Sequence, residues 1–208
     1  MDKLDYRKQY NELYAPSKKE ISIVKVPAFN FLMIDGTGDP NTSPRMQVAF
    51  EALFSVSYTL KFMFKQGKLG RKVPDYGVMP PEGLWWADDM SKFSQKDKSN
   101  WIWTMMLMQP DFATKEDVRK AIDAAGKKKP LPGLKDLRFE RYEEGLSAQI
   151  LYLGPFSDEG PTIQRIHETI KEKGFVLRGK HHEIYLSDMR RTKPEKLKTI
   201  IRQPCAKP

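Results

Sequence analysis

Apolar residues recur at helical spacing in three stretches of this 208-residue chain. Between residues 44 and 66 they recur at alternating intervals of three and four, which is the stripe of a helix with one buried face. The stripe consists of Met46, Ala49, Leu53, Val56 and Leu60. Shorter stripes run through 114–125 and 160–172, and a glycine closely follows each stretch, as is common at helix ends. We therefore expect helices over 44–66, 114–125 and 160–172.

Apolar runs between these stretches predict strands. The expected strands are 21–26, 29–35, 73–79, 83–88, 100–109, 134–142, 146–153, 181–187 and 197–202. The first two are predicted to be broken at Pro27, because proline cannot donate to a strand ladder. Residues 36–40, which read GTGDP, predict a turn. The segment Glu143-Glu144-Gly145 predicts the turn of a hairpin between 134–142 and 146–153.

The two halves of the chain repeat one order of predicted elements. Each half reads strand, strand, helix, strand, strand, so we expect a single domain over 1–208 that contains two pseudo-repeats, about 19–109 and 134–203. Residues 1–18 are expected to form an N-terminal arm, and 114–125 a linker helix. The pattern predicts an α+β fold in which antiparallel sheets carry helices on one side and leave an open ligand cleft on the other.

Four tryptophans lie in two tight clusters. Trp85 and Trp86 are adjacent after a proline-rich turn, whereas Trp101 and Trp103 are two residues apart in the apolar run WIWTMMLM. Residues two apart project from the same face of a strand, so Trp101, Trp103 and Met105 are expected to share a face. Flat aromatic walls with flexible thioethers suit a planar apolar ligand. The alternative is that both clusters only fill the core.

The segment 181–187 carries the strongest polar signal. Alternation places His181, Glu183 and Tyr185 on one face of the predicted strand, and His182 and Ile184 on the other. Glu183 is then directed into the cleft beside a tyrosine. A carboxylate in such a poorly solvated place attracts a cationic ligand or acts as a base with a raised pKa. The alternative is a solvent-facing glutamate without a function.

No metal or cofactor is expected. His181 and His182 are adjacent on a strand, point to opposite faces and cannot chelate one ion, and His167 is the only other histidine. The GTG of residues 36–38 lacks the remainder of a phosphate-binding loop. Glu82 precedes the tryptophan pair and is either a second carboxylate of the cleft or, as turn residues more often are, a solvated side chain.

The charge and composition set broad limits on partners. The formal net charge is +9, but the 36 basic residues are scattered among 27 acidic ones and no nucleic-acid-binding motif is present, so nucleic acid is not the expected partner. No apolar run approaches the roughly 20 residues of a membrane span, and the N-terminus does not read as a signal peptide. The single cysteine, Cys205, fits a reducing cytoplasm, where we expect the protein to be located.

Six segments together, in this order, resemble the GyrI-like small-molecule-binding family in its stand-alone form. They are DGTGDPN, VSYTLKF, PPEGLWW, WIWTMMLMQP, LYLGPF and HHEIYLSD. The resemblance covers nearly the whole chain and implies a duplicated strand-helix-strand-strand unit. It also implies that Glu183, on the strand matching HHEIYL, lies in the ligand cleft. One departure is Tyr152, where many members have a histidine.

Stand-alone members of this family hydrolyse the cyclopropane ring of DNA-alkylating natural products of the yatakemycin type inside an aromatic cage. The resemblance therefore implies a protective hydrolase for such xenobiotics. Opening the ring needs a positioned water, which Glu183 is expected to orient or deprotonate, and a donor to the oxygen that gains charge, which is Tyr185 or an indole N–H. The expected ligands are planar aromatic or cationic small molecules. The expected ligand-binding residues are Trp85, Trp86, Trp101, Trp103, Met105, Tyr152 and His181. The alternative is a drug-sequestering, gyrase-modulating or effector-type binding protein without turnover.

Overall fold

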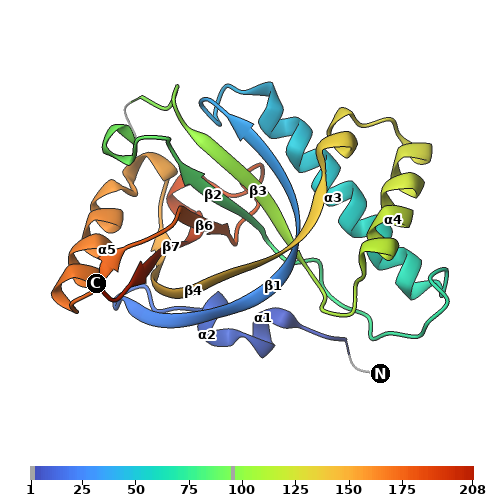
Figure 1. The fold of residues 1–208 in the computed structure, drawn as a ribbon, viewed down its shortest axis with the longest axis horizontal. Helices are drawn as coiled ribbons and strands as arrows, with labels where there is room; N and C mark the ends of the chain where they lie inside the picture. The colour runs from blue at the N-terminus through green and yellow to red at the C-terminus, as the bar shows by residue number, and fades with distance from the viewer. Residues whose placement is uncertain (1–2, 95–96) are drawn as a thin grey trace.

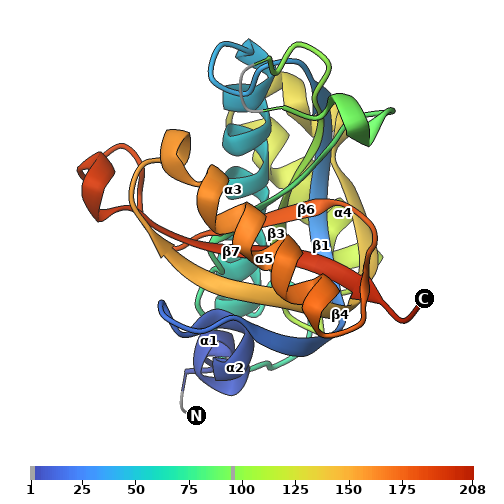
Figure 2. The same cartoon turned by 90° about the vertical axis from the view of Figure 1, so that its left-hand side faces the viewer.

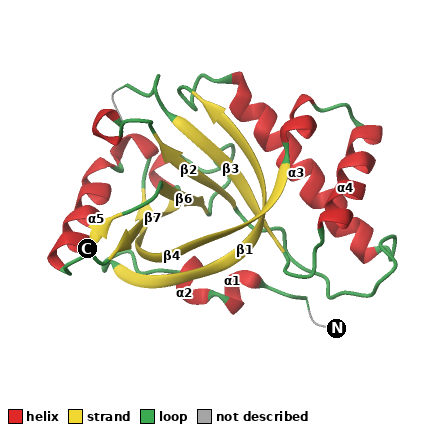
Figure 3. Ribbon diagram, viewed as in Figure 1, coloured by secondary structure: helices red, strands yellow, loops and turns green. Residues whose placement is uncertain are grey.

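Helices and strands alternate along residues 3–94 and 97–208, which are the residues that this computed structural model describes. The α-helices are α1 Tyr6–Gln9, α2 Asn11–Tyr14, α3 Pro44–Lys65, α4 Lys115–Lys128 and α5 Gly160–Glu172. The strands are β1 Ser22–Thr37, β2 Pro81–Trp86, β3 Ile102–Gln109, β4 Arg138–Leu153, β5 Val176–Leu177, β6 His181–Tyr185 and β7 Lys198–Ala206. Figures 1 and 3 show the strands at the centre with the helices around them. The three long helices expected from apolar spacing are confirmed.

The strands form one antiparallel sheet that closes on itself. Their order is β4-β1-β3-β2-β6-β7-β5, and β4 also pairs with β7. Six strands therefore form a ring, to which β5 adds a short edge on β7. Helix α3 packs on β1 and β3, and α5 packs on β4 and β7. Figure 2 shows α5 lying across its strands in front of the ring. The predicted α+β class with an antiparallel sheet is confirmed.

Pro27 does not interrupt the first strand. Pairing with β4 continues on both sides of it, at Val26 with Gly145 and at Ala28 with Glu143. Proline costs a strand one donor but has a backbone angle that an extended chain tolerates, and neighbouring pairs hold β1 together. The prediction of two strands was therefore wrong. The turn predicted at 36–40 begins later, because β1 continues to Thr37, and the chain then bends at Gly38 and turns at residues 40–42.

The predicted hairpin at Glu143-Glu144-Gly145 was also wrong. Arg138–Leu153 is a single strand of 16 residues. Gly145 adopts a φ of +75°, which bends the strand without reversing it. The expected strand at 73–79 is absent as well, since in the described chain this segment contributes only an isolated bridge between Tyr76 and Leu4. Pro74 and Gly77 lie within it, and both residues disfavour a strand interior.

The two halves share one order of elements and one pairing scheme. The first is β1-α3-β2-β3 and the second is β4-α5-β6-β7, apart from the short β5. In each half the first strand pairs with the last, and the last pairs with the one before it. We propose that 19–109 and 134–203 are two copies of one unit joined by α4. None of the described helices is both long and apolar enough to cross a membrane.

Candidate active site

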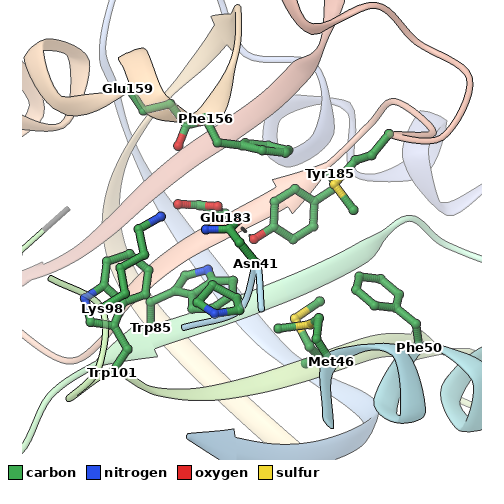
Figure 4. A pocket seen from close by; sticks show the side chains of 13 residues that line it. Asn41, Met46, Phe50, Trp85, Lys98, Trp101, Phe156, Glu159, Glu183 and Tyr185 are labelled. Carbon is green, nitrogen blue, oxygen red and sulfur yellow. Dashed lines mark hydrogen bonds between the residues drawn. The ribbon is translucent and has the colours of Figure 1, made fainter. Parts of the chain in front are cut away.

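A cavity of about 110 Å³ lies between the N-terminal end of α3, the start of α5 and strands β2, β3 and β6. Its lining residues are Pro40, Asn41, Met46, Phe50, Trp85, Lys98, Trp101, Met105, Phe156, Glu159, Glu183, Tyr185 and Met189. In Figure 4 the carboxyl groups and Lys98 gather at one end, and Met46 and Phe50 lie at the other. The cavity therefore lies on the sheet face that the helices cover, between the two helices. The prediction of an open cleft on the opposite side was wrong, because the sheet closes and its other face points into the ring of strands.

Strand alternation on β6 supplies the central carboxylate. His181, Glu183 and Tyr185 share a face, as predicted, and all three are buried. Glu183 lies across from Gly83 on β2. A side chain at Gly83 would place its Cβ 2.9 Å from the ring of Trp85. The glycine therefore lets the indole lie flat against the sheet beside Glu183, at the floor of the cavity.

Glu183 is held in its charged form. Its Oε2 accepts a hydrogen bond of 2.7 Å from the hydroxyl of Tyr185, and its Oε1 lies 3.1 Å from Nε2 of His181. Burial acts to raise the pKa of Glu183, but these two partners and the charge of Lys98 outweigh it and lower that pKa. Burial beside the carboxylate raises the pKa of Tyr185 well above its usual value, so the phenol keeps its proton.

Glu159 is a second carboxyl group in the cavity, and the sequence analysis missed it. It is the residue before α5, is 1% exposed, and makes no capping hydrogen bond to the helix. Burial, followed by the charge and a hydrogen bond of Glu183, raises the pKa of Glu159 to about 10. Within the described residues its Oε1 has no hydrogen-bond partner. In sequence, a glutamate before Gly-Pro at a helix start reads as a solvated cap, so no signal marked it.

One cavity thus holds a charged and a neutral carboxyl group side by side. Two titrating groups whose surroundings push their pKa values apart can act as base and acid at the same pH. Lys98 completes the polar end, with its Nζ 4.7 Å from the centre of the Trp101 ring. The arrangement can remove a proton at Glu183 and supply one from Glu159.

Aromatic rings form the rest of the wall. The ring centres of Trp85 and Trp101 are 5.6 Å apart, and Phe93 stacks behind Trp101 at 4.5 Å. Met105 lies in the same lining and is fully buried. Trp85, Trp101 and Met105 therefore surround the space in which a flat ring would lie.

Four residues predicted to bind ligand do not line the cavity. Trp103 is fully buried behind Trp85. Its ring lies directly on Gly36, where a Cβ atom would be 2.1 Å from the indole. Trp86 points to the other face and packs its ring under the Lys180 Nζ at 3.3 Å. Tyr152 donates its hydroxyl to the carbonyl of Pro155. His181 acts on the cavity only through Glu183.

The opposite face of β6 carries a second, closed polar cluster inside the ring of strands. The ring nitrogens of His182 lie 2.9 Å from Glu144 and 3.0 Å from Glu82. Arg202 bonds Glu144 at 3.2 Å and the carbonyl of Leu13 at 2.8 Å. Tyr14 of α2 donates to Glu82 at 2.9 Å, so Glu82 is not a solvated turn residue. This cluster ties the N-terminal arm to the sheet.

Burial acts to lower the pKa of His182, but the carboxylates of Glu144 and Glu82 outweigh it and raise that pKa to about 9. The charges of His182 and Arg202, opposing burial, lower the pKa of Glu144. The cluster thus pairs two cations with two carboxylates. In the residues that the structure describes, no group of three His, Cys, Asp or Glu side chains is placed to hold a metal ion.

The sequence and fold of this chain match one domain family and several solved structures. A family model described as a GyrI-like small molecule binding domain matches residues 19–205. An uncharacterized conserved protein from Listeria innocua is 40% identical, with a TM-score of 0.88 over 98% of this chain and 100% of that one. A hydrolase encoded by lin2189 from the same organism is 38% identical, with a TM-score of 0.87 over 99% and 100%.

A more distant solved structure shares the fold alone. The C-terminal domain of EcmrR is 11% identical, with a TM-score of 0.59 over 91% of this chain and 98% of that domain. No curated protein matches the chain.

Proposed function

Because the chain belongs to the GyrI-like small-molecule-binding family, we propose that it binds planar aromatic molecules in this cavity and opens the strained ring of cyclopropanoid alkylators with water. The observation that carries the proposal is the pair of carboxyl groups, charged Glu183 and neutral Glu159, at one end of an aromatic-walled cavity. That a relative 38% identical over its whole length is named a hydrolase supports the reaction class.

The proposed reaction adds one water molecule. A cyclopropane fused to a dienone breaks one carbon–carbon bond as water attacks its methylene carbon, and the bond electrons pass to the carbonyl oxygen as the ring becomes a phenolate. Glu183 takes a proton from the water, and Glu159 supplies a proton to the phenolate oxygen, directly or through solvent. The proton then passes from Glu183 back to Glu159, which lines the same cavity, and the pair is ready for another turnover.

The surrounding residues position the reactants. Trp85 and Trp101 stack on the flat part of the ligand, while His181 and Tyr185 fix the orientation of Glu183. General base catalysis supplies about 10²–10⁴-fold, which suffices for a strained and already electrophilic ring.

The test is incubation of the pure protein with a cyclopropanoid alkylator, followed by mass spectrometry. We expect a product heavier by one water, formed over many turnovers. A non-catalytic, drug-sequestering protein would bind the alkylator, quench its own tryptophan fluorescence and leave the compound intact, and that result would contradict the proposal. The matched control is Glu140→Gln, which changes an exposed carboxylate outside the cavity.

A further inference from the structure

Four aromatic residues form a line along the exposed side of α3. Phe50, Phe54, Tyr58 and Phe62 recur at intervals of four, so they lie one above the next on the helix. The rings of Phe50 and Phe54 are 6.3 Å apart and 11° from parallel, and those of Phe54 and Tyr58 are 6.3 Å apart and 24° from parallel. We call these four residues the α3 aromatic line.

This line is unusual because it faces solvent. Tyr58 and Phe62 are each 48% exposed, and Phe50 and Phe54 are only partly buried. The exposed side of a surface helix is ordinarily polar, and adjoining exposed apolar side chains mark a contact surface. The fully buried stripe that packs on the sheet is a different one and includes Leu53 and Leu60. Phe50 and Phe54 contact the core in part, whereas Tyr58 and Phe62 are exposed.

The line begins at the candidate active site. Phe50 is both its first member and part of the cavity lining. Figure 4 shows Phe50 at the end away from Glu159 and Lys98. A ligand with its reactive end at the carboxyl groups would therefore leave the cavity past Phe50, and the next surface it meets is Phe54.

The size of the cavity makes such an exit necessary for a large ligand. Its volume is about 110 Å³, less than the ~150 Å³ of an engineered cavity that holds a single benzene ring. The twelve residues from Phe50 to Phe62 extend about 18 Å along the helix at 1.5 Å per residue. The line is thus long enough for two or three further ring systems.

We propose that the α3 aromatic line is the outer part of the ligand site, where it contacts the rings of a planar ligand that do not fit into the cavity. The reactive ring of the ligand enters the cavity only in part, and the remainder of the ligand lies along Phe54 and Tyr58. This inference rests on the proposed binding function. A second copy of the chain is the poorer occupant. Tyr58 and Phe62 are each 48% exposed and offer roughly 200 Å² between them, against the ~800 Å² per partner of a stable interface.

The test compares a long dye with a short one. The long probe is a bis-benzimidazole dye, and the short probe is 2-phenylbenzimidazole, each titrated against tryptophan fluorescence. Tyr58→Ala and Phe54→Leu should each weaken the long probe about tenfold, the size of one lost stacking contact, and leave the short probe within about twofold. The matched control is Leu177→Ala, which removes an exposed apolar side chain on β5.

The outcomes separate the two proposals. Equal affinity of the long probe for wild type and both variants would overturn the role of the line, as would a shift from dimer to monomer in Tyr58→Ala with unchanged binding. Failure of both probes to bind the wild-type protein would overturn the proposed function as well. Thermal unfolding checks that Phe54→Leu remains folded, and Tyr58→Ala alters a side chain that is half exposed.

Discussion

Two histidines adjacent in the sequence face two different clusters. His181 supports Glu183 in the cavity, whereas His182 lies between Glu82 and Glu144 inside the ring of strands. The inner cluster is balanced, because two carboxylates face the two cationic side chains of His182 and Arg202. All four carboxylate oxygens of Glu82 and Glu144 have a hydrogen-bond partner. The cavity cluster has an unpartnered oxygen on Glu159 and open space beside it.

The difference distinguishes a structural cluster from a reactive one. Both contain buried glutamates next to a histidine, so residue types alone do not separate them. Buried polar groups that are fully bonded hold a structure in place, whereas a group left incomplete beside a cavity has a ligand still to meet. The inner cluster is therefore interpreted as the anchor of the N-terminal arm, and the cavity cluster as the site of chemistry.

The largest expected effect is on turnover. Glu183→Gln keeps the shape of the side chain but cannot take a proton, so kcat for the alkylator should fall about 10²–10⁴-fold, with the affinity for a neutral planar ligand little changed. Glu82→Gln on the adjacent strand should leave kcat near that of wild type in the folded protein. A loss of kcat in Glu82→Gln equal to that in Glu183→Gln would remove the distinction between the two clusters.

The inner cluster should instead dominate stability. His182→Ala leaves Glu82 and Glu144 without their shared cation and should lower the free energy of unfolding by about 3–5 kcal/mol, measured in urea. Because the folded pKa of His182 is raised from 6.5 to about 9, its contribution is complete below pH 6.5 and is lost as the pH rises through 9. A stability curve for wild type minus His182→Ala that is flat from pH 6.5 to 9 would contradict this.

Glu159 should destabilise the fold at neutral pH. Its pKa is raised from 4.5 to about 10, so its favourable state is present below pH 4.5 and its contribution is lost as the pH rises. By pH 7 the loss is about 3 kcal/mol at 1.36 kcal/mol per unit. Glu159→Gln should therefore gain about that much stability over wild type between pH 4.5 and pH 7. An unchanged difference across that interval would show that Glu159 is ionised in the native protein.

Replacing Trp85 should affect ligand binding, whereas replacing Trp103 should affect stability. Trp85→Ala removes a wall of the cavity and should weaken a planar ligand by about 1–3 kcal/mol, measured by fluorescence titration. Trp103→Ala removes a side chain buried behind it and should act on stability, at a cost of about 3–5 kcal/mol, with ligand affinity nearly kept in the folded protein. A ligand effect confined to Trp103 would place the site elsewhere.

Local patterns in the sequence predicted the long helices and the alternation of β6, because both depend on neighbours a few residues apart. They did not predict that Pro27 and Gly145 lie within continuous strands, since those strands are held by pairs more than a hundred residues apart in sequence. The same limit applied to the site. Alternation assigned Glu183 to one face of its strand. Glu159 lies in the same cavity only because α5 packs on the sheet, and local spacing does not show this packing.

Sequence spacing also could not separate Trp85 from Trp103. Both project from one sheet face and are direct cross-strand neighbours. Each ring lies over a glycine, Trp85 over Gly83 and Trp103 over Gly36. What distinguishes the two is that only Trp85 borders the cavity, and this depends on how the helices pack on the sheet. The split between cavity and core is therefore a property of the assembled fold.

The most direct test of the account is the pH dependence of kcat/KM for the alkylator. With Glu183 charged and Glu159 protonated, the wild-type profile should hold a plateau through neutral pH and fall on the alkaline side as Glu159 loses its proton. Glu159→Gln should be slower and should lack the alkaline fall. A wild-type rate that stays constant through pH 10, or an alkaline fall that survives in Glu159→Gln, would contradict the assignment of the two carboxyl groups as base and acid.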